Sequence, residues 1–143
     1  MATWKGKSVL IVDDNVSAAA AVERAATEVG LNVIGLACSG LDALEKLKEQ
    51  IPDYISLDII MPEMDGIECY RRIRNSYPSV EVFFVSALSN EPRLKEVYSD
   101  TISEKSFVAK PITSDSLTEF LSSVSGRNEQ VDEVSQVPPP PPI

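Results

Sequence analysis

Short apolar runs alternate with segments of helical periodicity along most of the chain. Five runs each predict a β-strand, and they lie at residues 8–13, 32–38, 53–58, 80–86 and 105–109. A helical pattern follows each run: one stops at Gly30, one extends from a Ser39 cap to Pro52, and others lie at residues 66–77, 93–100 and 117–124. Because the strands are apolar rather than alternating, the pattern predicts an α/β domain whose parallel sheet is covered by helices on both faces.

This pattern ends at about residue 125. The remaining residues, 126–143, include five consecutive prolines and no aromatic side chain. Such a segment buries too little apolar surface to order itself, and its proline run favours an extended polyproline II conformation. We therefore predict one folded domain over residues 5–125 and a flexible, proline-rich tail or linker over residues 126–143.

Polar side chains stand where four of the five predicted strands end. They are Asp13 and Asp14 after the first strand, Asp58 after the third, Ser86 after the fourth and Lys110 after the fifth. In an open parallel sheet, ligands bind beyond the carboxyl ends of the strands, where the strand order reverses. We expect these five side chains to lie together at that edge.

Three carboxylates in one pocket repel one another unless a cation neutralises them. Mg²⁺ prefers oxygen ligands and takes one or two carboxylates with several waters. Mn²⁺ could bind to the same ligands. We predict that Asp14 and Asp58 bind the ion directly and that Asp13 acts through water. The backbone carbonyl of Ile60 could supply a further oxygen.

Asp58 stands alone at its strand end and is the predicted nucleophile, since aspartate is an established phosphoryl acceptor. Phosphoryl transfer requires mainly positioning and charge stabilisation, which the Lys110 ammonium and the Ser86 hydroxyl would supply. Each residue alone has a commoner explanation: an Asp pair after a strand usually caps a helix, and a lysine before proline is usually just exposed. The presence of all these residues together at the ends of neighbouring strands favours the catalytic interpretation.

The composition excludes several other chemistries. The chain has no histidine, which excludes a Ser-His-Asp triad, and its two cysteines, Cys38 and Cys69, are too few for a four-cysteine zinc site. The net charge of −9, from 13 basic and 22 acidic residues, disfavours direct binding to nucleic acid. We find no signal peptide and no apolar run of membrane-spanning length, so we expect a cytoplasmic protein without membrane insertion.

The ordered set of motifs resembles the receiver domain of two-component response regulators, of the chemotaxis type. The matching segments are VLIVDD at residues 9–14, LDIIMPEMDG at 57–66, VSA at 85–87 and KP at 110–111. The resemblance covers about residues 7–124. It implies a flavodoxin-like (βα)5 fold, a doubly wound five-stranded sheet with strand order 2-1-3-4-5.

The resemblance also implies a role for each site residue. Asp58 would accept a phosphoryl group from the phosphohistidine of a sensor histidine kinase or of a histidine phosphotransfer protein. Asp13 and Asp14 match the acidic pair, and Lys110 matches the lysine that contacts the phosphoryl group. The Lys110–Pro111 bond resembles one that is often cis in the family.

Further positions match residues that control the family's response. Ser86 and Phe107 match a switch pair that moves on phosphorylation and alters the surface of the fourth helix, fifth strand and fifth helix towards a downstream target. Ile60 and Leu88 match positions that tune the attack of water on the phosphoryl group. Both are apolar here, and we hypothesise slow self-dephosphorylation. The segment 98–107 lacks the Gly-Ala pair of many receivers. The resemblance therefore does not predict the conformation of the output surface there.

The main hypothesis is a phosphorylation-dependent signalling switch that catalyses only its own phosphorylation and dephosphorylation and is otherwise not an enzyme. The alternatives are a phosphorelay intermediate or phosphate sink, a receiver fragment of a larger regulator with a missing output domain, and a phosphorylation-independent interaction module. A haloacid-type hydrolase is disfavoured because its Asp-x-Asp pattern is not matched at Asp13. The resemblance implies a monomer or a weak, phosphorylation-dependent dimer.

Overall fold

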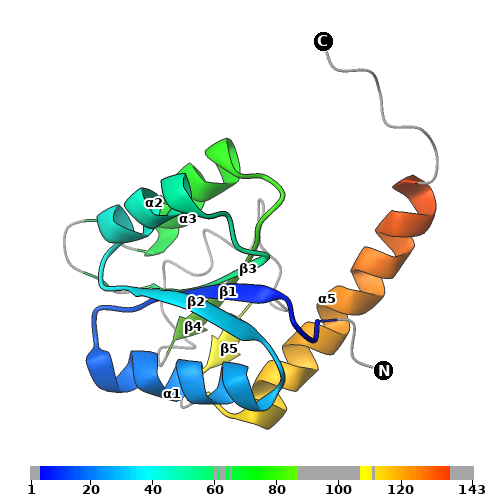
Figure 1. Ribbon diagram of the computed structural model, residues 1–143, viewed down its shortest axis with the longest axis horizontal. Helices are drawn as coiled ribbons and strands as arrows, with labels where there is room; N and C mark the ends of the chain where they lie inside the picture. Colours follow the sequence, from blue (N-terminus) through cyan, green and yellow to red (C-terminus); the bar gives the residue numbers. More distant parts are fainter. Residues whose placement is uncertain are drawn as a thin grey trace.

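The computed structural model of the chain describes residues 4–59, 61, 64, 66–86, 107–110 and 112–135. Within these residues, strands and helices alternate in the predicted order (Figure 1). Their bounds are β1 Ser8–Val12, α1 Val16–Glu28, β2 Asn32–Ala37, α2 Gly40–Glu49, β3 Tyr54–Asp58, α3 Gly66–Ser76, β4 Glu81–Ser86, β5 Phe107–Ala109 and α5 Ser114–Ser135. The weak helix predicted at 93–100 lies outside the described residues.

All five strands form one parallel sheet in the order β2-β1-β3-β4-β5, which confirms the flavodoxin-like topology that the resemblance implies. Helices α1 and α5 cover one face of this sheet, and α2 and α3 cover the other (Figure 1). Since β1 lies between β2 and β3, the chain reverses its direction of winding at β1. The crevice at the carboxyl ends of β1 and β3 is therefore the expected ligand site.

The sheet separates two apolar clusters, and β4 contributes to both. Phe83 and Phe84 are fully buried and point to opposite faces, because successive side chains of a strand alternate. The Phe84 ring packs on Tyr70 of α3 at a centroid distance of 5.4 Å, and the Phe83 ring packs on Phe120 of α5 at 4.8 Å. Both layers of helices are thus anchored on one central strand.

Two polar side chains start the first helices. The Asn15 carboxamide oxygen accepts the Ala18 N–H at 2.9 Å at the start of α1, and the Ser39 hydroxyl accepts the Asp42 N–H at 3.0 Å at the start of α2. Each cap satisfies an amide that has no partner within its helix. The Ser39 cap was predicted; at α1 the cap is Asn15 and not a member of the Asp pair.

Helix α5 continues to Ser135, through residues that the sequence pattern assigned to a flexible tail. Val124 is fully buried, and the apolar periodicity read from the sequence ends there. Residues 127–135 lack proline and glycine, so local propensity permits the helix to continue to Ser135. The division into a folded domain over residues 5–125 and a flexible tail or linker over residues 126–143 stays a prediction. Among the described residues, no helix is long and apolar enough to span a membrane.

Tyr54, the first residue of β3, links stability to alkaline pH. Burial raises the pKa of its phenol above the usual 10.0, and the charges of Glu81 and Asp53 add to the effect. The neutral phenol is favoured in the fold, so its contribution to stability is complete below pH 10 and is lost as the pH rises through the folded-state pKa. Between about pH 10 and pH 11, we expect the free energy of unfolding to fall less in Tyr54→Phe than in the wild type, because the variant has no phenol to ionise at this position.

Urea denaturation at each pH measures this difference. The matched control is Tyr77→Phe, which removes the hydroxyl of a half-buried tyrosine and shows the effect of losing a phenol elsewhere in the chain. A Tyr54→Phe curve parallel to that of the wild type would contradict the expectation.

Candidate functional site

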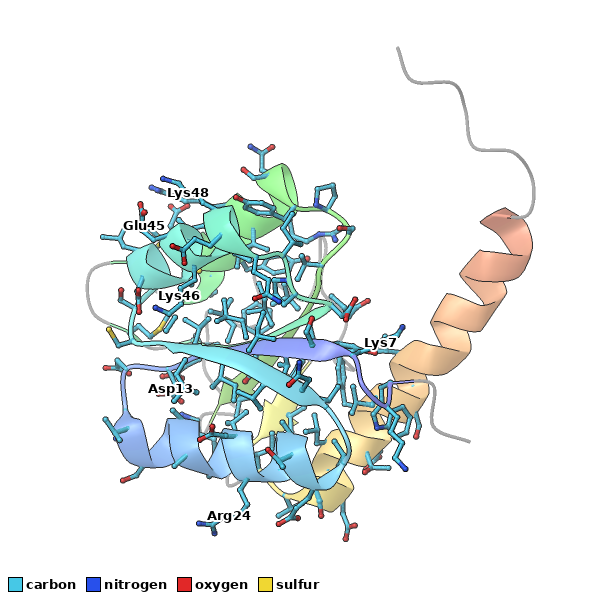
Figure 2. All side chains as sticks on the ribbon, viewed as in Figure 1. Lys7, Asp13, Arg24, Glu45, Lys46 and Lys48 are labelled. Carbon is cyan, nitrogen blue, oxygen red and sulfur yellow. The ribbon has the colours of Figure 1, made fainter. Side chains whose placement is uncertain are left out.

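Three carboxylates meet at the carboxyl edge of the sheet. Asp13 and Asp14 directly follow β1, and Asp58 is the last residue of β3. Because β1 and β3 are neighbours, with Val12 opposite Leu57, one carboxylate oxygen from each aspartate lies within 4.8 Å of the others. Figure 2 shows Asp13 where β1 passes into the loop before α1. The three aspartates that were predicted at the strand ends therefore lie together.

Both oxygens of the Asp13 carboxylate have a partner. Oδ1 accepts the backbone N–H of Asn15 at 2.9 Å, and Oδ2 accepts from Lys110 Nζ at 3.1 Å. The Asp13 side chain is only 2% exposed, and hydrogen bonds of this kind compensate for the burial of a polar group. This aspartate is consequently fixed in one orientation.

Lys110 reaches a second carboxylate from the end of β5. Its Nζ lies 3.6 Å from Asp58 Oδ1, while it also contacts Asp13. Among the described residues, the Lys110 ammonium contacts two of the three carboxylates, so these four side chains together carry a formal charge of −2. The excess negative charge favours an additional cation at this edge of the sheet.

The donor set fits a small divalent cation. The three carboxylate oxygens lie within 4.8 Å of one another, close enough for one small cation to be held between them. Mg²⁺ prefers oxygen ligands and commonly takes one or two carboxylates and several waters, so the residues that could hold it are Asp13, Asp14 and Asp58.

Two glycines allow helices to approach the backbone next to the site. The Gly66 N–H donates to the Ile59 carbonyl at 2.7 Å, and a Cβ at Gly66 would overlap the Asp58 carbonyl oxygen. At the start of α2, a Cβ at Gly40 would lie 2.9 Å from the Met64 sulfur. The first residue of α3 therefore packs on the backbone of Asp58 and Ile59, and the first residue of α2 packs on Met64. The sequence alone does not show these two contacts.

The other predicted site residues are placed in part. Ser86 ends β4, and its backbone pairs with Ala109 just before Lys110; Phe107 begins β5 opposite Phe84. Both residues therefore lie on the strands that flank the site, and their predicted switch roles stay predictions. Ile60, Leu88 and Pro111 lie outside the described residues.

Comparison with known proteins is consistent with this geometry. The model of the response regulator receiver domain matches residues 9–122. The chemotaxis protein CheY of Thermotoga maritima is 35% identical over 120 residues, which are 84% of this chain and 98% of that protein. The crystal structure of the CheX–CheY–BeF3–Mg complex from Borrelia burgdorferi superimposes with a TM-score of 0.75 at 32% identity, over 85% of this chain and 90% of that one.

The chain belongs to the response regulator receiver domain family, whose members are phosphoryl-accepting signalling switches rather than metabolic enzymes and bind Mg²⁺ in an acidic pocket. Within that family it is a receiver of the CheY type. A protein-glutamate methylesterase/protein-glutamine glutaminase of Trichodesmium erythraeum is also 35% identical over 104 residues, 72% of this chain. The match covers only 30% of that longer protein, so the likeness concerns its receiver portion.

The clustered charge has a measurable cost. In the absence of divalent cations, the carboxylates repel one another, and Lys110 lies closer to Asp13 than to Asp58. We expect Asp58→Asn to raise the free energy of unfolding by about 1–2 kcal/mol in EDTA, because it removes one of the repelling charges.

Urea denaturation of both proteins tests this expectation. Glu23→Gln, which neutralises an exposed carboxylate on α1, is the control and should change stability by less than about 0.5 kcal/mol. A less stable Asp58→Asn protein would contradict the assignment of mutual repulsion.

Proposed function

We propose that the chain is a signalling switch that accepts a phosphoryl group on Asp58 from the phosphohistidine of a sensor histidine kinase or histidine phosphotransfer protein. One observation carries the choice of residue. Asp58 is the last residue of β3, its Oδ1 lies 3.6 Å from Lys110 Nζ, and its side chain is 11% exposed against 2% for Asp13. Asp58 therefore lies beside a cation and is less buried than Asp13.

The transfer is a displacement at phosphorus. An Asp58 oxygen forms a P–O bond while the P–N bond to the donor histidine breaks, and the imidazole leaves with the electron pair of that bond and takes up a proton. The Lys110 ammonium stabilises the negative charge on the phosphoryl oxygens. In dephosphorylation, the oxygen of a water forms a P–O bond to the same phosphorus while the P–O bond to Asp58 breaks, which restores the carboxylate and releases inorganic phosphate. These are the only reactions that we propose the chain catalyses.

Asp14 and Asp58 would hold Mg²⁺, or Mn²⁺, directly, with the Ile60 carbonyl as a further ligand. Asp13 would act through water, which agrees with the engagement of both its oxygens by Asn15 and Lys110. When bound, the ion supplies positive charge that stabilises the transferring phosphoryl group.

The output follows from the added charge. A phosphoryl group carries about −1.5 to −2 charges, and we propose that the Ser86 hydroxyl responds to it and that Phe107 changes position with it. The two residues lie on paired strands, with Phe107 opposite Phe84 and Ser86 opposite Ala109. The altered surface would comprise residues 93–105, β5 and α5.

The proposed biological setting is a cytoplasmic receiver over residues 5–125. Its phosphorylated form would bind a downstream target protein, as a monomer or a weak dimer. The Borrelia CheY, by comparison, was solved in a complex with CheX. Rapid return of the phosphoryl group to a histidine phosphotransfer protein would instead favour the phosphorelay alternative.

Intact mass after incubation with acetyl phosphate tests the proposal. We expect one phosphoryl group to be added in the presence of Mg²⁺ and none in EDTA, since the carboxylates then lack their counter-charge. Asp58→Asn should add none, while the exposed-carboxylate control Glu23→Gln should behave as the wild type. Equal uptake by Asp58→Asn would reject Asp58 as the acceptor.

The lifetime of the phosphorylated form tests the apolar tuning positions. An apolar Ile60 and Leu88 offer no group to orient an attacking water, so the wild type should lose its phosphoryl group slowly. We expect the double variant Ile60→Asn, Leu88→Glu to lose it about tenfold faster, which corresponds to about 1.4 kcal/mol in the barrier. The release of inorganic phosphate over time measures both rates, and a faster wild type would refute the hypothesis.

A further inference from the structure

Asn15 connects the acidic site to the first helix through two hydrogen bonds. Its backbone N–H donates to Asp13 Oδ1 at 2.9 Å, and its side-chain Oδ1 accepts the Ala18 N–H at 2.9 Å. The residue is extended, with φ −97° and ψ 117°, which is the usual conformation of a helix cap. The same residue thus closes the end of α1 and contacts a site carboxylate.

The side-chain bond determines where the backbone N–H points. An Asn15 side chain bound to the Ala18 amide restricts the residue's own φ and ψ, and the peptide plane that carries the N–H is restricted with them. That N–H and the Lys110 ammonium contact different oxygens of Asp13, so together they define the plane of its carboxylate. If the Asn15 N–H no longer held Oδ1, only Lys110 would restrain the Asp13 carboxylate among the hydrogen bonds described here, and the carboxylate could rotate.

Asp14 is not restrained in this way. It precedes Asn15 and is exposed, so the cap acts on the buried member of the pair. We propose that Asn15 is a positioning residue for Asp13, and that the capping of α1 sets the affinity of the acidic cluster for Mg²⁺. This inference rests on the magnesium site proposed above.

The chain offers a matched control in the second helix. Ser39 caps α2 by accepting the Asp42 N–H at 3.0 Å, and its side chain contacts none of the three aspartates. Asn15→Ala and Ser39→Ala therefore remove the same kind of helix cap, but only the first removes one that is linked to a site carboxylate. Asn15→Ser restores a capping oxygen at the first position.

The experiment titrates each full-length protein with Mg²⁺ alone and follows backbone amide NMR shifts to obtain a dissociation constant. We expect Asn15→Ala to weaken binding about three- to tenfold, less than the usual loss when a direct partner of a ligand is removed. Asn15→Ser should return to within about twofold of the wild type, because it retains the cap. Ser39→Ala should lower the urea midpoint to a similar extent as Asn15→Ala and leave the Mg²⁺ affinity unchanged.

The outcomes separate this inference from the proposed function. Wild-type affinity in Asn15→Ala, equal weakening in Ser39→Ala, or failure of Asn15→Ser to restore binding would each overturn the positioning role while the metal site stands. A wild-type protein that binds no Mg²⁺ would overturn the metal site and the positioning role together.

Discussion

The repulsion among three carboxylates at one edge of the sheet is the constraint on which the site depends. One oxygen of each lies within 4.8 Å of the others, and among the described residues the Lys110 ammonium contacts two of the three, Asp13 and Asp58. The fold tolerates this because each aspartate is treated differently. Asp13 is buried with a donor on each oxygen, Asp14 is exposed to water, and Asp58 lies beside Lys110. The remaining negative charge favours the binding of a cation at this site. A bound cation would in turn offset the negative charge of a phosphoryl group.

The sheet provides the rigidity that such an arrangement requires. β1 and β3 are apolar and buried on both faces, so the aspartates at their ends start from fixed backbone positions. β4 lies between the acidic strands and Lys110, and its Phe83 and Phe84 pack on α5 and α3, respectively. A displacement of β4 would therefore alter the packing of α3 and of α5. A change at Ser86, the last residue of β4, could reach both faces of the domain through these contacts.

The helices add local restraints to this frame. Gly66 lets the start of α3 contact the backbone of Asp58, and Gly40 lets α2 approach Met64 in the chain that follows. The Asn15 cap connects α1 to Asp13. Three of the four described helices, α1, α2 and α3, thus contact the site or the chain beside it at their first residue or cap.

The sequence by itself determined the order of strands and helices, the parallel sheet, and the aspartates and lysine that end the strands. These properties are local, because periodicity and the position at a strand end can be recognised within a few neighbouring residues. The order of the strands came from a family resemblance, and the structure confirmed it.

Only the tertiary structure decided which partners these residues have. Lys110 contacts Asp13 across 97 positions in the sequence, and the indole N–H of Trp4 donates to the Val29 carbonyl of a distant loop. The difference between a buried Asp13 and a more accessible Asp58 is likewise a result of packing. Even the end of α5 at Ser135 was not apparent from the sequence, because the apolar periodicity ends at Val124. Contacts between distant segments and the burial they cause exist only once the chain has folded, and the chemistry of the site depends on both.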